Sequence, residues 1–244
     1  MSDGAETIDA LRERLSSDDR VLVVVAGPNG AGKTTFVETF LKTTGLRIVN
    51  PDQIARALSP DAPDTVAYEA AQLADTVRRD LVARRISFCM ETVFSDPDGA
   101  KVAFLREARS QGYVVFLVFI GLSSGDLAIA RVVQRTEAGG HDVPDEKITA
   151  RFPRTFENLR QAITFVDHAL VFDNSSADEP YRFIAEFAGA KVVRQGSYRS
   201  AWAADLLVTR TSNDNPRRAQ RERPGAPCAA VTADPAHSQS RARG

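Results

Sequence analysis

Cysteine is scarce in this sequence, and so are long apolar runs. Its 244 residues include two cysteines, Cys89 in a predicted strand and Cys228 in a polar stretch. They form no disulfide framework and lack metal-ligand spacing. No apolar run approaches the roughly 18 residues that a membrane-spanning helix needs. The start, Met1-Ser-Asp-Gly-Ala-Glu, lacks the basic and apolar segments of a signal peptide. We therefore expect a cytoplasmic protein without a membrane partner.

Charge is nearly balanced, with 31 basic residues against 32 acidic ones and a net charge of −1. The whole chain therefore offers no argument for nucleic-acid binding. Among the basic residues 26 are arginine and 5 are lysine, so a single arginine is weak support for a site. Apolar content of 43% and charged content of 26% are typical of a soluble globular protein.

One stretch organises the rest of the chain. Five apolar residues from Val21 predict a buried parallel strand, which runs into Gly27-x-x-x-x-Gly32-Lys33-Thr34. This is the P-loop pattern at every fixed position, followed by an amphipathic helix as the motif requires. A chance glycine-rich turn would lack that context. The predicted nucleotide-binding residues are Gly27, Pro28, Asn29, Gly30, Ala31, Gly32, Lys33, Thr34 and Thr35.

The residue types of the P-loop match phosphate chemistry. Glycines allow successive backbone N–H groups to turn inward as an anion-binding nest, and the helix adds its positive end. Lys33 would meet the β- and γ-phosphates, and the Thr34 hydroxyl would ligate Mg²⁺. ATP and Mg²⁺ are therefore the predicted cofactors. No L-S-G-G-Q signature is present, which argues against a transporter-type ATPase.

Strands and helices alternate along the chain, which predicts an α/β protein with a P-loop NTPase fold. After the first strand we expect strands at 46–49, 85–90, 113–122 and 168–172, giving a parallel five-stranded sheet wrapped by helices. The helices are expected to begin near residues 33, 61, 96, 123, 144 and 179, the last spanning 179–187. A short strand at 191–194 would complete the domain.

Three regions are predicted from composition. Residues 1–20 form a helical appendage with Ile8, Leu11 and Leu15 on one face. Residues 21–205 form the P-loop domain. Residues 206–244 form a disordered basic tail, because apolar periodicity ends near Arg210 and proline, alanine, serine and arginine dominate. Most such tails are merely solvated, although contact with nucleic acid or a partner is an alternative.

Polar residues follow several predicted strands. Ligands of an open parallel sheet bind outside the carboxyl ends of its strands. That edge includes Asn50 with Asp52, Glu91 with Thr92, Ser123 with Ser124, and Asp173 with Asn174. Asp52 and Glu91 end strands that we expect to flank the P-loop strand. Asp52 is the candidate catalytic base and Glu91 a candidate substrate contact. The alternative for Asp52 is the N-cap of a helix beginning near Gln53.

A basic stripe marks the helix after Pro144. Ile148, Phe152, Phe156, Leu159 and Ile163 form an apolar face that continues across Pro153, and Lys147, Arg151, Arg154, Asn158 and Gln161 form the opposite face. With Gly139-Gly140-His141 as a hinge, the stripe predicts a lid that brings Arg151 and Arg154 to the phosphates. Arg131 and Arg135 are further candidates, and His141 a candidate hinge or substrate contact. The alternative is a solvated arginine face.

These segments together resemble the zeta-toxin-like P-loop kinases. The resemblance covers about residues 21 to 175 and rests on the P-loop, Asn50-Pro-Asp-Gln-Ile-Ala55, Glu91-Thr92, Gly139-Gly-His-Asp-Val-Pro144, and Arg151-Phe-Pro-Arg154 with Asn158-Leu159. It implies a nucleoside-kinase-like fold with an arginine-bearing lid. It also implies phosphorylation of a sugar hydroxyl of UDP-N-acetylglucosamine or a similar small polar acceptor.

By this similarity Asp52 matches the catalytic base and Glu91 the substrate-contacting acid, while Lys33 and Thr34 match the nucleotide site. The family's phosphate-binding arginines are carried over as candidates to Arg131, Arg135, Arg151 and Arg154. Gly139-Gly-His-Asp-Val-Pro144 departs from the classical toxins, which leaves the acceptor open. An antitoxin is a partner that the resemblance brings in, although no antitoxin-like segment is recognisable.

Two other functions stay open at this point. A polynucleotide or RNA-end kinase would need a basic groove leading to Asp52 and salt-sensitive binding. A nucleotide-dependent switch would not need the carboxylates at the sheet edge. The leading prediction is ATP-dependent phosphoryl transfer to a hydroxyl, and nucleic acid is the less favoured partner.

Overall fold

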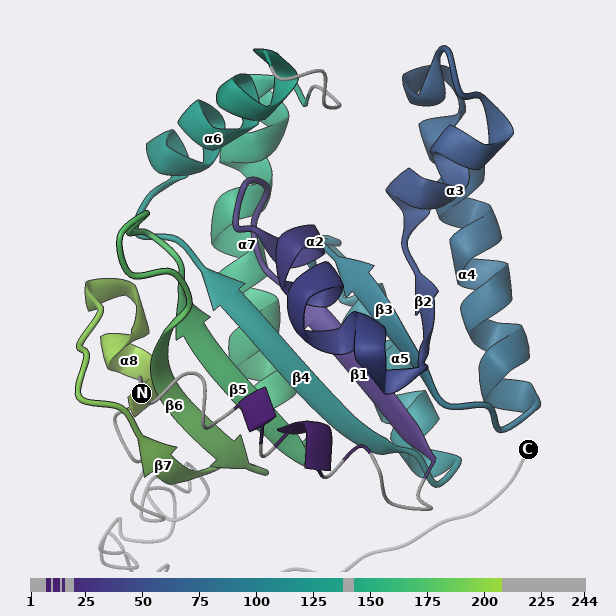
Figure 1. The fold of residues 1–244 in the computed structure, drawn as a ribbon. Coiled ribbons are helices and arrows are strands. Elements are labelled where there is room, and N and C mark those ends of the chain that lie inside the picture. Colours follow the sequence, from purple (N-terminus) through teal and green to yellow (C-terminus); the bar gives the residue numbers. More distant parts are fainter. Residues whose placement is uncertain (1–7, 10, 14, 16–19, 138–142, 208–244) are drawn as a thin grey trace, which may run out of the picture. The chain divides into compact units, whose positions relative to one another are not determined.

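The computed structural model describes residues 8–9, 11–13, 15, 20–137 and 143–207, shown in Figure 1. In chain order the elements are β1 (Val21–Ala26), α2 (Lys33–Phe36), the π-helical turn η1 (Val37–Leu41), the 3₁₀ turn η2 (Lys42–Thr44), β2 (Arg47–Val49), α3 (Pro51–Leu58), the 3₁₀ turn η3 (Pro63–Val66), α4 (Ala67–Ala83), β3 (Phe88–Thr92), α5 (Ala100–Ser110), β4 (Val114–Gly121), α6 (Gly125–Glu137), α7 (Asp145–Ile163), β5 (His168–Asp173), β6 (Arg182–Ala188), β7 (Lys191–Gln195), the 3₁₀ turn η4 (Ala201–Ala203) and α8 (Ala204–Leu207).

The strands form one sheet in the order β2-β3-β1-β4-β5-β6-β7, and the first five are parallel. The five predicted parallel strands are therefore confirmed. The expectation that the strands of Asp52 and Glu91 both flank the P-loop strand is wrong, because β3 and β4 flank β1 and β2 pairs with the outer side of β3. Strand order depends on pairing between distant segments, and the pattern within each strand does not encode it.

The predicted helix over 179–187 is also wrong. Residues Arg182–Ala188 form β6, which pairs antiparallel with β5, and β7 pairs antiparallel with β6. The sheet thus has seven strands instead of five. Phe183, Ile184 and Phe187 are all buried, and such a short apolar run fits a buried helix or a strand equally well. Pairing with β5 decides between them. The short strand predicted at 191–194 is confirmed as β7.

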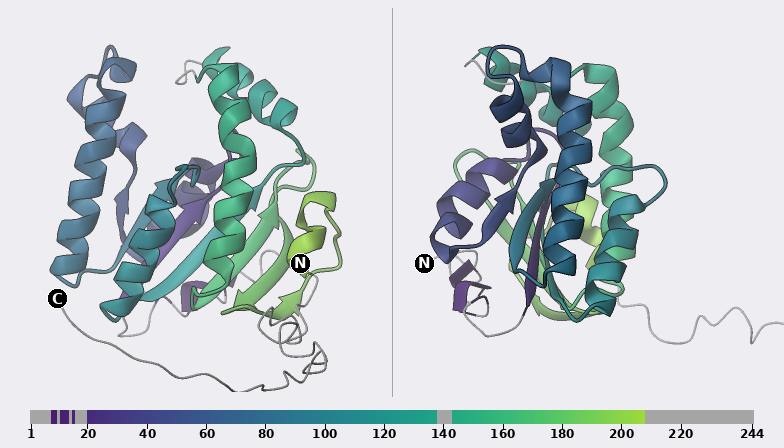
Figure 2. Two further views of the ribbon diagram at one scale, coloured as in Figure 1. Left: turned by 180° about the vertical axis from the view of Figure 1, so that it is seen from behind. Right: turned by 90° about the vertical axis from the view of Figure 1, so that its right-hand side faces the viewer.

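Alternate residues of β1 enter two separate cores, since successive side chains of a strand point to opposite faces. Leu22, Val24 and Ala26 pack with residues of α4, α5 and α7. Val21, Val23 and Val25 pack with residues of α2, η1 and α6. Helices therefore cover both faces of the sheet, as the turned views in Figure 2 show.

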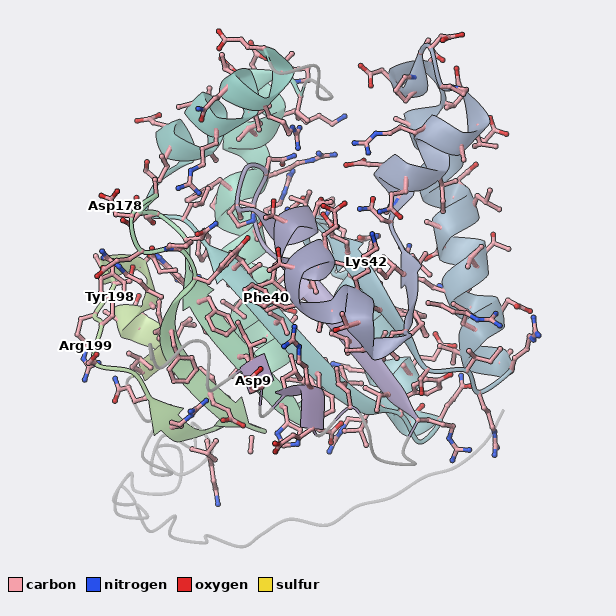
Figure 3. The ribbon with its side chains drawn as sticks, in the orientation of Figure 1. Asp9, Phe40, Lys42, Asp178, Tyr198 and Arg199 are labelled. Carbon is pink, nitrogen blue, oxygen red and sulfur yellow. The ribbon has the colours of Figure 1, made fainter. Side chains whose placement is uncertain are left out.

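The helical residues before β1 dock on the second of these faces. Ile8 and Leu11 are buried there, in agreement with the apolar face predicted for this segment. Arg12 Nε donates a 2.9 Å hydrogen bond to the Phe40 carbonyl of the π-helical turn, and Figure 3 labels Phe40 on that turn. This hydrogen bond fixes the segment before β1 to the π-helical turn.

The C-terminal part of the domain closes over the end of β5. Asp173 is buried and accepts hydrogen bonds from the Ser200 hydroxyl at 2.9 Å and the Trp202 indole N–H at 2.6 Å. Leu206 and Leu207 pack against the first core, so the folded part reaches at least Leu207 and passes the predicted boundary at 205. The rest of the predicted tail lies outside the described residues.

Two helical arms rise beyond the carboxyl ends of the strands (Figure 1). One contains α3 and the start of α4, and the other contains α6 and the start of α7, with the P-loop and α2 between them. This arrangement positions residues from both arms around the P-loop. None of the helices among the described residues is long and apolar enough to span a membrane.

Candidate active site

The P-loop follows β1 at the carboxyl edge of the sheet. Gly27 has φ +151°, and a side-chain Cβ there would lie 2.1 Å from the Ile120 carbonyl oxygen, so only glycine fits against β4. Lys33 is 8% exposed, and its ammonium donates a 2.8 Å hydrogen bond to the Pro28 carbonyl. Lys33 thus folds back over the loop, with its charge in a buried position beside the nest.

Charged groups from four elements surround Lys33. Burial lowers the pKa of the Lys33 ammonium, and two carboxylates oppose that effect while two guanidinium groups add to it. In order of effect these groups are Glu91, Asp52, Arg135 and Arg151. They come from β3, α3, α6 and α7, so both arms contribute to the field at Lys33. The structure therefore brings most of the predicted site residues together.

Glu91 connects the P-loop to the second strand. Its Oε1 accepts a 2.8 Å hydrogen bond from the Thr34 hydroxyl, and its Oε2 accepts one of 2.8 Å from Asn50 Nδ2. Burial raises the pKa of the Glu91 carboxyl, while Lys33 and these hydrogen bonds lower it. Both carboxylate oxygens are thus engaged within the site.

Asp52 stands at the second position of α3 and is exposed. The N-cap of α3 is Asn50, whose Oδ1 accepts a 2.8 Å hydrogen bond from the Asp52 backbone N–H. The alternative interpretation of Asp52 as an N-cap is therefore wrong, because Asn50 caps α3 and the Asp52 carboxylate does not. Because Asn50 also donates to Glu91, it ties the Asp52 backbone to the P-loop side of the site.

The four candidate arginines differ in their surroundings. Arg151 is partly buried, and its pKa is lowered by burial and by Arg154 and raised by Asp52. Arg135 is exposed, and its positive charge lowers the pKa of Lys33. Arg131 donates a 3.2 Å hydrogen bond to the Ser175 carbonyl, which joins α6 to the loop after β5. In Arg154 the buried Nε has no hydrogen-bond partner, which leaves a donor beside Arg151.

The second half of α7 is fixed to the body of the domain. The Thr155 hydroxyl donates to the Val93 carbonyl at 3.0 Å, and Asn158 Nδ2 donates to the Phe94 and Asp96 carbonyls at 3.0 and 3.1 Å. Asn158, predicted on the face opposite the apolar stripe, is therefore a buried structural residue and not part of a basic surface. The apolar face of α7 is buried as predicted except at the partly buried Phe152, and the helix continues through Pro153. Arg151 and Arg154 thus stand on an anchored helix.

Other predicted edge residues serve the scaffold. Thr92 Oγ1 accepts a 3.0 Å hydrogen bond from the Phe94 N–H, and Ser124 Oγ accepts one of 3.1 Å from the Leu127 N–H at the start of α6. The Ser123 N–H donates to the Ser175 hydroxyl at 2.9 Å. His141 and the Gly139-Gly140 hinge lie outside the described residues.

Sequence reasoning missed Tyr181 because the segment around it was interpreted as a helix. Its hydroxyl donates a 2.9 Å hydrogen bond to the Gly32 carbonyl of the P-loop. Burial raises the pKa of Tyr181 to about 12, so the hydroxyl keeps its proton at neutral pH. No local pattern in the sequence marks this residue, since its partner is 149 positions away.

The residues near Thr34 suit Mg²⁺ bound together with a triphosphate. Mg²⁺ prefers oxygen ligands, keeps several waters and shares phosphate oxygens, so it does not need a protein cage. The Thr34 hydroxyl beside a buried carboxylate is such an oxygen set. No cluster of three or more His, Cys, Asp or Glu side chains that could hold a metal occurs in the described part of the chain.

A hollow of about 480 Å³ lies at the opposite edge of the sheet and is lined by residues including Arg106, Arg109 and Phe165. Arg109 is paired with Asp167 and Arg106 lies over the Phe165 ring, so these cations already have partners. Chemistry is better placed at the P-loop, where carboxylates and arginines converge.

Comparison with known proteins agrees with this geometry. The family model of the zeta toxins matches residues 6–182. The chain belongs to the zeta toxin family. The match to the family model ends at the start of β6. In this zeta toxin family member, β7 and the C-terminal turns therefore lie beyond the matched segment. Family membership and the fold together support an ATP-dependent kinase in general.

A curated relative and two solved structures are similar to the chain. An uncharacterized protein of Haemophilus influenzae is 24% identical over 142 residues, covering 58% of this chain and 99% of the relative. The AvrRxo1-ORF1:-ORF2 structure with ATP has a TM-score of 0.58 at 20% identity, covering 78% of this chain and 67% of that one. The PezAT toxin–antitoxin structure of Streptococcus pneumoniae has a TM-score of 0.53 at 15% identity, covering 85% and 87%. These likenesses establish a P-loop kinase fold.

Proposed function

We propose that this protein transfers the γ-phosphate of ATP to a hydroxyl of a small polar acceptor, such as a nucleotide sugar. The observation that carries the proposal is that Asp52 and Glu91, on α3 and β3, and Arg135 and Arg151, on α6 and α7, all lie near enough to Lys33 for their charges to shift its pKa. A kinase needs this set, because charge develops on the transferring phosphoryl group while the acceptor loses a proton. A nucleotide switch would have no need of an exposed carboxylate at that point.

The roles follow from position. The P-loop, Lys33 and Thr35 hold the phosphates, while Arg131 lies beside the loop after β5. The oxygen of the acceptor hydroxyl bonds to the γ-phosphorus while the bond between that phosphorus and the ADP oxygen breaks. Asp52 accepts the proton that the hydroxyl loses. Arg135, Arg151 and Arg154 stabilise the charge on the phosphoryl oxygens. Asn50, Glu91 and Thr92 are the proposed acceptor contacts, and His141 is a further proposed contact on the ground of the sequence alone.

A bound Mg²⁺ would be held by Thr34 and the triphosphate, with Glu91 orienting the Thr34 hydroxyl. It would supply positive charge to the β- and γ-phosphate oxygens. The protein's own residues orient the acceptor, exclude water and take the proton.

The test is transfer of label from γ-labelled ATP. UDP-N-acetylglucosamine, a small-metabolite extract and a 5′-hydroxyl RNA oligonucleotide are offered in parallel to the wild type and to Lys33→Ala. We expect label on a small acceptor with the wild type and none with Lys33→Ala, which lacks the phosphate-contacting charge. Label on the RNA end alone would favour a polynucleotide kinase. No transfer to any acceptor, despite ATP binding, would favour a switch.

An antitoxin-like protein is the partner that we propose. The PezAT structure is a toxin–antitoxin system, and AvrRxo1-ORF1 is paired with AvrRxo1-ORF2. A protein that covers the space between the two arms would block ATP and acceptor together. Purification of the tagged chain from its own cells, followed by mass spectrometry, tests this; a specific partner should be displaced by ATP.

A further inference from the structure

The loop between β5 and β6 holds the back of the P-loop. Asn174 follows β5 and is 8% exposed; its Nδ2 donates a 2.9 Å hydrogen bond to the Ala31 carbonyl. Tyr181 precedes β6, and its hydroxyl donates a 2.9 Å hydrogen bond to the Gly32 carbonyl. The two residues also bind each other, because the Tyr181 N–H donates to Asn174 Oδ1 at 3.1 Å. Two successive P-loop carbonyls are thus held from one side.

The planarity of the peptide bond turns these contacts into a constraint on the anion nest. In a trans peptide unit the C=O and the following N–H point in opposite directions. A carbonyl of Ala31 held toward Asn174 therefore turns the Gly32 N–H away from that loop. A carbonyl of Gly32 held toward Tyr181 does the same for the Lys33 N–H. These are the N–H groups that a bound phosphate meets.

Steric and conformational details of the loop agree with this reading. Gly32 has φ +84°, and a Cβ there would lie 2.7 Å from Asn174 Nδ2 and 3.1 Å from the Tyr181 hydroxyl oxygen. Tyr181 itself has φ +54°, a strained conformation for a residue with a side chain. Its ring packs edge-on against Phe36 and Phe40, with centroids 5.4 and 5.8 Å away. Backbone hydrogen bonding and ring packing thus both fix the position of the Tyr181 hydroxyl.

We propose that Asn174 and Tyr181 are positioning residues that pre-organise the P-loop nest for the phosphates of ATP. The inference rests on the proposed function and adds residues to the same site. Tyr181 touches the loop from behind and need not contact the nucleotide. Loss of the Tyr181 hydroxyl should therefore lower the affinity of every ligand that binds the nest by the same factor, whether or not the ligand carries a nucleobase.

The experiment measures affinities of ATP and inorganic tripolyphosphate by calorimetry for the wild type and Tyr181→Phe. The substitution keeps the ring and removes the hydroxyl, which makes hydrogen bonds with the Gly32 carbonyl and with the Thr35 side chain. We expect both affinities to fall by the same factor, about 3- to 10-fold. Tyr113→Phe is the matched control, since the Tyr113 hydroxyl also donates to backbone carbonyls, those of Leu81 and Ile86 at 3.0 and 2.9 Å, away from the P-loop.

Each outcome is decisive. An equal loss for both ligands with Tyr181→Phe, and none with Tyr113→Phe, supports the proposal, and Asn174→Ala should reproduce it. A loss for ATP alone would place Tyr181 at the base or ribose and overturn the proposal. Unchanged affinities, or equal losses with Tyr113→Phe, would overturn it as well. If the wild type bound neither ligand, the nucleotide site itself would be wrong, which separates failure of the proposed function from failure of this inference.

Discussion

The Thr34 hydroxyl donates a 2.8 Å hydrogen bond to Oε1 of Glu91 and so joins the P-loop to the end of the adjacent strand. Asn50 occupies the other carboxylate oxygen at 2.8 Å. The helix that carries Asp52 is therefore tied through Asn50 and Glu91 to the residue expected to meet Mg²⁺. This chain of contacts makes Glu91 the first residue to test.

Glu91→Gln should raise the Mg²⁺ concentration needed for half-maximal transfer by about 10-fold, the scale on which orienting partners of metal ligands act. The acceptor KM should change less, because both carboxylate oxygens already have partners within the protein. Initial rates over a Mg²⁺ series and an acceptor series measure the two effects. A change confined to the acceptor KM would instead indicate direct contact between Glu91 and the acceptor.

Titration of Glu91 should also make the unfolding free energy of the protein depend on pH. Burial raises the folded-state pKa of Glu91 above its ordinary value of 4.5. The native state therefore favours the protonated carboxyl, and this contribution to stability is full below 4.5 and is lost as pH rises through the folded-state pKa. Relative to wild type, Glu91→Gln should gain unfolding free energy as pH rises from 4.5. Urea titrations between pH 4.5 and 8 check the sign, and a constant difference would contradict it.

Asp52→Asn should reduce transfer by roughly 10²–10⁴-fold, the usual contribution of a general base. ATP affinity and the thermal midpoint should stay near wild type, since Asp52 is exposed and Asn50 makes the helix cap. Asp61→Asn removes the same charge from an exposed position on the same arm and serves as the control. Activity is compared at matched ATP occupancy. A fully active Asp52→Asn would remove the base role.

Arg151→Ala and Arg154→Ala should lower kcat with modest change in the KM for ATP, because contacts made in the transition state act on turnover. Arg160→Ala on the exposed side of the last turn of α7 is the matched control. Steady-state kinetics with saturating acceptor separates kcat from KM. Normal turnover in both variants would return the stripe to the solvated-face interpretation.

Two truncations should separate the tail from the domain. Ending the chain after Thr209 should leave the thermal midpoint nearly unchanged, as the composition of the tail predicts. Ending it after Tyr198 removes Trp202, whose ring packs on Phe119 and Phe156 with centroids 5.9 and 5.0 Å away. That loss should cost about 3 kcal/mol or more, as for other buried aromatic rings. Calorimetry compares the three lengths, and a large loss of stability in the chain that ends after Thr209 would show that the tail docks.

The sequence by itself determined the parts of this protein whose chemistry is local. The P-loop could be predicted because its nest is made by adjacent backbone groups and its lysine and threonine follow at fixed positions. The position of Asp52 and Glu91 at the carboxyl edge could be predicted because parallel strands end at one edge of a sheet, whatever their order. The apolar stripe of α7 followed from helical periodicity in the same way.

Only the tertiary structure decided the remainder, because it depends on pairings between distant segments. The run from Arg182 to Ala188 became a strand through pairing with β5. Asn158 is buried because it donates hydrogen bonds to carbonyls of the loop after β3, and the periodicity of its own helix does not predict that contact. Asn174 and Tyr181 reached the P-loop across 143 and 149 positions. Strand order sets which side chains meet over such separations, and local propensity does not encode it.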